Sequence, residues 1–200
     1  MPSFLETLDE QRWDDHRYYH RSRINQSLHL VSALSFVCAY VLLFVDPALA
    51  ALVGWGISMV TRQAGHFFFE PKGFDQANGV SHEHKESIKV GYNLKRKVVL
   101  MSAWAASPLL LWLSPSLFGL IAPSAGAFGF AHDVGLLWLA LAVAGIVLRV
   151  LQLALLQNLR TGIVWMVKIL TDPFYDIGLY WKSPLYLLRG QLLDPEPNKR

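Results

Sequence analysis

Four mostly apolar runs divide this 200-residue chain, and their lengths restrict what it can fold into. They cover residues 28–45, 48–60, 98–113 and 134–156. A helix needs roughly 20 mainly apolar residues to cross the hydrocarbon core of a bilayer, and the longest run meets that length. Asp46 and Pro47 supply a turn between the first two runs, which are therefore expected to form a helical hairpin. The runs predict an all-α integral membrane bundle of about four transmembrane helices.

The composition supports this class of protein. Hydrophobic residues make up 53% of the chain and charged residues only 16%, whereas soluble domains carry roughly 25% charged residues. The net charge of +3 and the pI of about 9.0 would suit a nucleic-acid partner. However, the basic residues form no dedicated patch and no known binding motif, so we expect no nucleic acid. The single cysteine, Cys38, allows no intramolecular disulfide and no thiolate metal site.

Basic residues are distributed unevenly among the connecting segments. With four spans, the N-terminus, residues 62–97 and the tail fall on one side of the membrane, which receives every Lys and Arg except Arg149. The other side receives Asp46 and the segment 114–133, which has no Lys or Arg. Because connecting loops rich in Lys and Arg stay in the cytoplasm, both termini are predicted to be cytoplasmic. This topology fits a bacterial inner membrane, or the endoplasmic reticulum in a eukaryote.

Both ends of the chain are predicted to lie in the headgroup region. Residues 1–27 combine aromatic side chains with arginines and lack the apolar core of a signal peptide, so we expect an uncleaved, interfacial N-terminal helix. A soluble amphipathic helix is the alternative. The tail is predicted to form interfacial amphipathic helices with breaks at Pro173 and Pro184. The single membrane domain thus divides into the N-terminal segment 1–27, the hairpin 28–61, a His-rich cytoplasmic loop 62–97, a second pair of spans 98–156 and the amphipathic tail 157–200.

The stretch from Gln63 to Gly73 carries the strongest indication of chemistry. His66 and Glu70 are four residues apart, so they share one face of a helix. Pro71 is expected to end that helix at about Glu70. An imidazole and a carboxylate at this spacing can bind a metal together, or the carboxylate can orient the imidazole as a metal ligand.

A second histidine is predicted to lie at the same depth as His66. Asp46 marks the tip of the hairpin, with His29 17 residues before it and His66 20 residues after it. Because a helix rises about 1.5 Å per residue, His29 and His66 reach nearly the same level at the cytoplasmic membrane edge. His20 precedes the first apolar run, and Asn25 shares a helix face with His29.

Neutral imidazole is a common metal ligand, and a His-rich site with carboxylate support suits iron or another first-row metal. An extended loop would place two further histidines on one face, because their positions differ by two residues. The predicted ligands are His20, His29, His66, His82 and His84. For each of them, the alternative is a polar residue at the headgroup level without a ligand role.

Two short motifs combine these residues with others. Tyr19, His20, Asn25 and His29 form the first, and Gly65, His66 and Glu70 form the second after the hairpin. Together they resemble the 2-hydroxy fatty acid dioxygenase family of fungi and its bacterial relatives, over roughly residues 13–75. The chain departs from the family at Arg23, where proline is usual. It also departs after Glu70, where the segment 71–75 replaces a basic-x-Arg-Pro-Ala pattern.

The resemblance implies an iron(II)-dependent membrane enzyme of fatty acid α-oxidation, which uses O2 to shorten 2-hydroxy fatty acids by one carbon. Fe2+ would be the cofactor, and the acid would chelate it through its hydroxyl and carboxylate groups. Asn25 and Glu70 are then the predicted catalytic residues. Phe67 would line the site for the acyl chain, and Arg62 or Lys72 would hold the substrate carboxylate. For these two basic residues, anchoring at the membrane edge is the favoured alternative.

Two other classes of function stand beside this prediction. His29 and His66 on adjacent helices could bind a b-type haem axially. Against this, such a haem usually lies within the span, and Asn25 and Glu70 would have no role. The remaining class is a non-enzymatic membrane scaffold with interfacial histidines.

Overall fold

The computed structural model describes residues 3–89 and 94–195, and this part of the chain consists of helices and their connecting loops. It contains no strand beyond two isolated bridges, so the all-α prediction is confirmed for these residues. The first helices are α1 (Phe4–Tyr19), α2 (Arg23–Leu42), α3 (Pro47–Val53), the π-helical η1 (Gly54–Met59), α4 (Val60–Ala64) and the π-helical η2 (Gly65–Phe69). They are followed by α5 (His82–Ile88), α6 (Leu94–Ala106), α7 (Pro108–Leu113), α8 (Gly126–Leu156), α9 (Leu159–Tyr180) and α10 (Ser183–Leu188).

The first two apolar runs form the predicted hairpin. Ser22 caps α2, because its side chain accepts a hydrogen bond from a backbone N–H of the first turn. Asp46 caps the returning helix in the same way. Pro47 occupies the first position of that helix, where its missing N–H would have had no partner. Local sequence signals therefore explain where both arms begin.

The returning arm is longer than its apolar run. From α3 to η2 the helical segments follow one another without a break, so the chain stays helical to Phe69. The segment 62–97, predicted as a loop, therefore begins with helix and also contains α5. Pro71 ends the helix as predicted, because it holds the preceding residue, Glu70, in extended backbone. His66 consequently lies on a helical turn that packs against α2.

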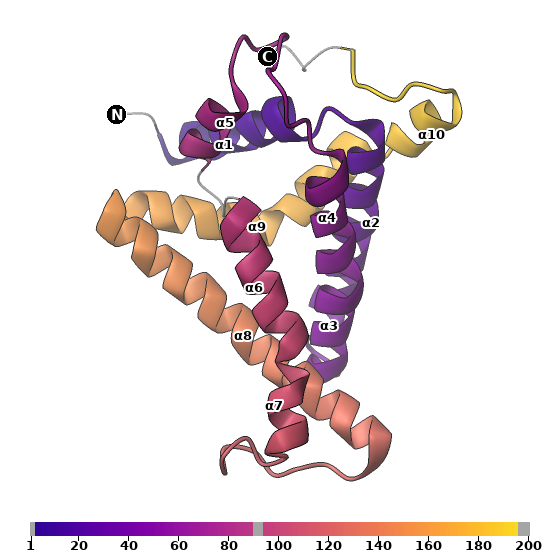
Figure 1. Ribbon diagram of the computed structural model, residues 1–200, viewed down its shortest axis with the longest axis vertical. Coiled ribbons are helices and arrows are strands. Elements are labelled where there is room, and N and C mark those ends of the chain that lie inside the picture. Colours follow the sequence, from indigo (N-terminus) through magenta and orange to yellow (C-terminus); the bar gives the residue numbers. More distant parts are fainter. Residues whose placement is uncertain (1–2, 90–93, 196–200) are drawn as a thin grey trace.

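The longest helix of the described chain, α8, crosses the hairpin and packs against both α3 and α9 (Figure 1). Its close approach to α3 depends on Gly135, since a Cβ atom there would lie 2.4 Å from the carbonyl oxygen of Ala48. The hairpin, α8 and α9 form a three-sided arrangement in Figure 1, in which α6 is seen between α8 and the hairpin, and α7 packs against α8.

The helices α1, α5, α9 and α10 lie toward one end of the molecule, and the segment 114–125 lies at the opposite end (Figure 1). The chain after α10 returns to the turn between α1 and α2, where the N–H of Asp194 donates to the carbonyl of Arg21 over 2.8 Å. The N-terminal helix, α5 and the tail thus share one end, called here the α1–α9 end. That this end is cytoplasmic stays a prediction.

Apolar side chains are exposed along α2 and α8. They include Leu34 and Val41 on α2 and Val143, Leu148 and Leu155 on α8. Within the described residues, these two helices are the ones long and apolar enough to cross a membrane. The prediction of about four spans is not confirmed, because the returning arm contains π-helical segments and a turn separates α6 from α7.

One prediction about the tail is wrong and another is confirmed. Pro173 does not break the tail, because it lies buried inside α9. A proline inside a helix costs about 3 kcal/mol, and here the flanking residues Asp172 and Asp176 are held by side chains of neighbouring helices. Pro184 does mark a break, since α9 ends at Tyr180 and this proline lies in the first turn of α10.

Candidate metal centre

Three histidines from separate helical segments meet inside the α1–α9 end. His20 ends α1, His29 lies on α2 and His66 lies on η2. Each offers one ring nitrogen, and these nitrogens all lie within 4.8 Å of one another. The ring centroids of His20 and His29 are 4.0 Å apart, and that of His66 lies 5.1 Å from the first and 5.0 Å from the second. All three side chains are buried. His29 and His66 therefore lie at one level of the hairpin, as predicted, and that this level is the cytoplasmic membrane edge stays a prediction.

The first turn of α2 places His20. Gln26 donates from Nε2 to the carbonyl oxygen of His20 over 2.7 Å, and Asn25 donates from Nδ2 to the carbonyl oxygen of Tyr19 over 2.9 Å. Both amides are fully buried. These two bonds fold the end of α1 back over α2, so the imidazole of His20 lies beside His29.

Gly65 allows the returning arm to bring His66 close to α2. A Cβ atom at Gly65 would lie 2.1 Å from Oδ1 of Asn25 and 3.5 Å from Cδ2 of His29. Asn25 has no free space to move, because it is fully buried and bonded to Tyr19. The structure thus makes Gly65 and Asn25 packing partners. A catalytic role for Asn25 stays a prediction.

Glu70 holds the second nitrogen of His66. The Nδ1 atom of His66 lies 2.7 Å from Oε2 of Glu70. Because an ionised carboxylate only accepts, Nδ1 carries the hydrogen and Nε2 keeps its lone pair. Lys89 lies 3.2 Å from the other oxygen of Glu70 and 3.8 Å from the ring centroid of Tyr19. This geometry corresponds to the orienting alternative for Glu70, and a catalytic role for it stays a prediction.

Tyr180 occupies the equivalent place beside His20. Its hydroxyl oxygen lies 3.0 Å from Nδ1 of His20 and 3.2 Å from Nδ1 of His16. Burial, with the nearby charge of Asp176, raises the pKa of Tyr180 well above its usual range. The Nε2 atom of His20 is buried and has no hydrogen-bond partner in the described part of the chain.

Both ring nitrogens of His29 lack a hydrogen bond to any described residue. Its Nδ1 lies 3.5 Å from Oδ2 of Asp176, which is within ion-pair range but too long for a good hydrogen bond. Asp176 is engaged instead by Arg62, which donates to it over 3.0 Å. An unsatisfied buried polar group costs roughly 1–3 kcal/mol, so these nitrogens are suited to bind a ligand.

The protonation state suits metal binding. Burial, and after it the nearby charge of His29, lowers the pKa of His20 well below its ordinary value of 6.5. The imidazole is therefore neutral at physiological pH, which is the form that coordinates metals. Three neutral histidines fit a first-row divalent metal ion and leave its other coordination positions open.

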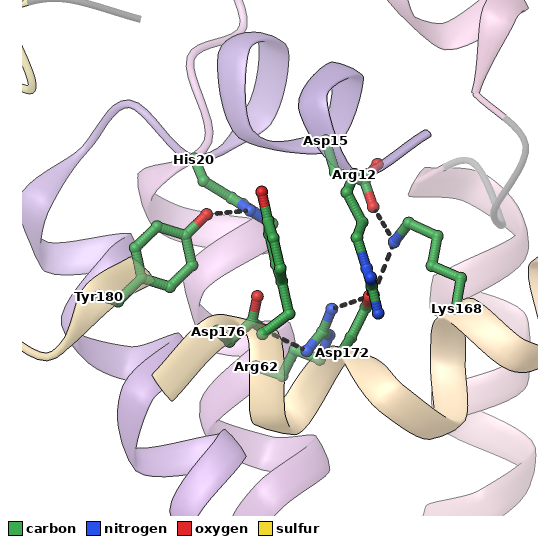
Figure 2. A pocket seen from close by; sticks show the side chains of 9 residues that line it. Arg12, Asp15, His20, Arg62, Lys168, Asp172, Asp176 and Tyr180 are labelled. Carbon is green, nitrogen blue, oxygen red and sulfur yellow. Dashed lines mark hydrogen bonds and ion pairs between the residues drawn. The ribbon is translucent and has the colours of Figure 1, made fainter. Parts of the chain in front are cut away.

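A small pocket next to His20 contains a network of paired charges (Figure 2). Arg12 donates to Asp172 over 3.2 Å, while Lys168 donates to Asp172 over 2.6 Å and also to Asp15. Burial alone would raise the pKa of Asp15, but nearby positive charges, Lys168 first among them, outweigh burial and lower it to about 2. The pocket is lined by Arg12, Asp15, His20, Arg62, Lys168, Asp172, Tyr175, Asp176 and Tyr180.

Sequence reasoning missed most of this network, although α9 carries a signal for it. Lys168, Asp172, Asp176 and Tyr180 follow one another at four-residue intervals in a mainly apolar segment. On a continuous helix they form one polar stripe. The expected break at Pro173 concealed the stripe, because two separate helices would not align its two halves.

The predicted substrate contacts differ in their surroundings. Arg62 lines the pocket, and its guanidinium is paired with Asp172 and Asp176. Lys72 is exposed in the segment after η2, and Phe67 is half-buried on η2 next to His66. The structure therefore brings Arg62 to the pocket and leaves Lys72 at the surface.

The assumption that placed His82 and His84 together is wrong. Both lie on α5, and residues two apart on a helix do not share a face. Neither belongs to the three-histidine group within the described residues. Instead, α5 is joined to the site by a hydrogen bond, in which the hydroxyl of Tyr19 donates to the carbonyl oxygen of Lys85 over 2.6 Å. A ligand role for the two histidines stays a prediction.

No family model, no curated protein and no solved structure matches this chain. The fold and the site define an all-helical protein with a candidate three-histidine metal centre. Its function is therefore argued from that centre.

Proposed function

We propose that this protein is a membrane-bound, iron(II)-dependent dioxygenase that shortens 2-hydroxy fatty acids by one carbon. One observation carries the proposal: His20, His29 and His66 converge with ring nitrogens that lie within 4.8 Å of one another. The same three residues belong to the two motifs that resemble the dioxygenase family. Three histidine ligands leave positions on the metal for a chelating hydroxy acid and for O2.

The contacts behind the ligands support this role. Glu70 and Tyr180 hold the Nδ1 atoms of His66 and His20, which leaves Nε2 of each ring available to a metal. Lys89 and Arg62 balance the carboxylates nearest to the histidines. A divalent ion would then add the positive charge to which the carboxylate of a substrate is attracted.

The overall reaction balances without a further reductant. When bound, iron(II) would supply the binding positions for both reactants and the electron exchange with O2. The bond between the carboxyl carbon and the hydroxyl carbon breaks, and the carboxyl carbon leaves as CO2. The hydroxyl carbon becomes the new carboxyl group, and one water forms. The chain's own residues hold the metal, shield it from bulk water and orient the acid, with Arg62 as the carboxylate contact favoured over Lys72.

We place α2 and α8 across a bilayer, with the α1–α9 end on the cytoplasmic side. The exposed apolar side chains of these helices suit lipid. The returning arm of the hairpin and the pair α6 and α7 would provide the other two spans. A fatty acid in the bilayer would then approach the histidines past Phe67, with its carboxylate at the membrane edge.

A b-type haem suits this geometry less well. If His29 and His66 were its axial ligands, the macrocycle would have to pass between them. The ring of His20 lies close beside both, with its centroid 4.0 Å from that of His29 and 5.1 Å from that of His66, and would crowd such a macrocycle.

Metal analysis of protein purified anaerobically in detergent is the first test. We expect about one iron per chain, without a Soret band, because the site offers one set of three histidines. The His66→Ala variant should lose the metal, since it removes one of three ligands. His132→Ala is the matched control, because His132 lies half-exposed near the start of α8.

Activity is tested with a 2-hydroxy fatty acid and O2. The expected product is the acid one carbon shorter, detected by mass spectrometry and absent with His66→Ala. A Soret band would favour the haem alternative. Protein that takes up no metal even after iron(II) is added back, and shows no Soret band, would contradict both the dioxygenase and the haem alternative and favour the scaffold.

A further inference from the structure

We infer that Tyr180, backed by His16, selects the nitrogen with which His20 binds its metal. The inference rests on the proposed metal centre and concerns two residues outside the motifs that define it. Because Tyr180 acts through His20, it is a positioning residue.

One hydroxyl group lies between two imidazoles. The oxygen of Tyr180 is 3.0 Å from Nδ1 of His20 and 3.2 Å from Nδ1 of His16. His16 and His20 are four residues apart at the end of α1, and Tyr180 is the last residue of α9. Figure 2 shows the hydroxyl turned toward His20. The exposed fractions are 4% for His16, 3% for His20 and 1% for Tyr180, so bulk water does not reach these groups freely.

The hydrogens on the two imidazoles and the phenol set the direction of these two hydrogen bonds. If His20 binds a metal through Nε2, its only hydrogen sits on Nδ1 and is donated to the oxygen of Tyr180. The single hydrogen of the phenol is then free to be donated to Nδ1 of His16. In this arrangement His16 accepts at Nδ1 and carries its own hydrogen on Nε2. The opposite tautomer of His20 would reverse both bonds and protonate the nitrogen that the metal needs.

The other ligand with a close outer partner is held differently. His66 faces Glu70, which can only accept, so its tautomer is set whether or not a metal is bound. Tyr180 can either donate or accept, so it occupies Nδ1 of His20 in either tautomer and leaves Nε2 as the nitrogen for the metal. Metal binding at Nε2 then fixes the direction of the hydrogen bonds. The tautomer of His16 consequently reports on the metal, although no ligand atom of His16 belongs to the three-histidine group.

Nitrogen NMR of protein whose histidines carry a nitrogen label tests the direction of the two hydrogen bonds at Tyr180. The probe is Zn2+, which is diamagnetic and suits three histidine ligands. A His16→Gln variant assigns the signal of His16. In the zinc-loaded parent protein we expect the hydrogen of His16 on Nε2 and that of His20 on Nδ1. A zinc-loaded His16 with its hydrogen on Nδ1 would overturn the inference.

Zinc affinity tests the positioning role by a second route. Tyr180→Phe removes only the hydroxyl, and loss of such an outer partner typically weakens metal binding by about 10- to 100-fold. Tyr40→Phe is the matched control, because it removes a hydroxyl that bonds to the backbone of α9 away from the histidines. The control should bind zinc like the parent. If Tyr180→Phe unfolds, His16→Leu removes the far acceptor instead and should weaken zinc binding by a smaller factor.

The outcomes separate this inference from the proposed function. A parent protein that binds zinc with the same affinity as Tyr180→Phe keeps the metal centre and overturns the role of Tyr180. A folded parent protein that binds no zinc overturns the metal centre, and the inference with it.

Discussion

The α1–α9 end and the α8 helix bury and expose opposite kinds of side chain. At the α1–α9 end, Lys168, Asp172 and His29 are buried, whereas Val143 and Leu155 of α8 are exposed. The buried charges of Lys168 and Asp172 are paired with each other, whereas the ring nitrogens of His29 have no hydrogen-bond partner in the described part of the chain. A polar interior is costly unless each group has a partner. The difference teaches that buried charges are gathered at one end, where ion pairs offset that cost.

The middle of the molecule also contains polar atoms, and two of its tryptophans donate hydrogen bonds between helices. Trp55 donates from Nε1 to the carbonyl oxygen of Trp138 over 3.0 Å, and Trp138 donates to the hydroxyl of Ser107 over 3.1 Å. These bonds join the hairpin, α8 and the turn between α6 and α7. They stabilise the arrangement and offer no ligand atom, so this region supports the site from a distance.

The largest effect on stability is expected at the buried charges. Lys168→Met would leave Asp15 and Asp172 without their shared ammonium group. Breaking a buried ion pair by removing one partner costs roughly 3–5 kcal/mol, so the thermal midpoint in detergent should fall clearly. The exposed Lys182 is the control, and Lys182→Met should change the midpoint little. Equal midpoints for the two variants would contradict the view that the α1–α9 end depends on paired charges.

At the α1–α9 end the loss of a charge is expected to be harmful, whereas on α8 the addition of a charge is. Val143→Arg places a charge on an exposed position near the middle of α8. In a lipid-facing span this costs about 3 kcal/mol, so membrane insertion should be impaired. Metal binding of the protein purified in detergent should be unchanged. Val143→Leu is the control, and normal insertion of the arginine variant would argue against α8 as a span.

An added methyl group should disturb the packing at the histidine site more than the packing on α8. Gly65→Ala would push a Cβ atom against Asn25, whereas a Cβ at Gly145 meets no described atom within 4 Å. Overpacking costs roughly 1–3 kcal/mol, and the shift of Asn25 should also lower metal content. Gly145→Ala should leave both the thermal midpoint and the metal unchanged. The two variants are compared by melting curves and elemental analysis.

The smallest expected effect is an acid-side loss of stability at Asp15. Its pKa is about 2 in the folded protein, below the value of about 3.9 expected in the unfolded chain. Because the folded pKa is the lower one, the contribution of Asp15 is complete above about pH 4 and is lost as the pH falls toward 2. The thermal midpoint should therefore drop less steeply over this range in Asp15→Asn. Parallel slopes for the variant and the parent would contradict the pairing with Lys168.

Local and periodic signals predicted the hairpin and the meeting of its two histidines. The caps at Ser22 and Asp46 set where the arms begin, and helical rise then puts His29 and His66 at one level. The four-residue spacing of His66 and Glu70 likewise predicted that their side chains meet, and they do so over 2.7 Å. These features were accessible because each depends on residues within one helix or one tight turn.

The position of α9 and its contacts with the site depend on packing between segments far apart in the chain. Apolar periodicity and charge asymmetry on their own establish an all-helical chain with apolar helices and a pair of histidines at one depth. Only the tertiary structure brings α9 under α1, and with it the pairs of Lys168 with Asp15 and of Tyr180 with His20. It also keeps α9 helical through Pro173. The physical reason is that a helix records its own period in its sequence, whereas the choice of packing partner follows from the summed burial and pairing of side chains on several helices.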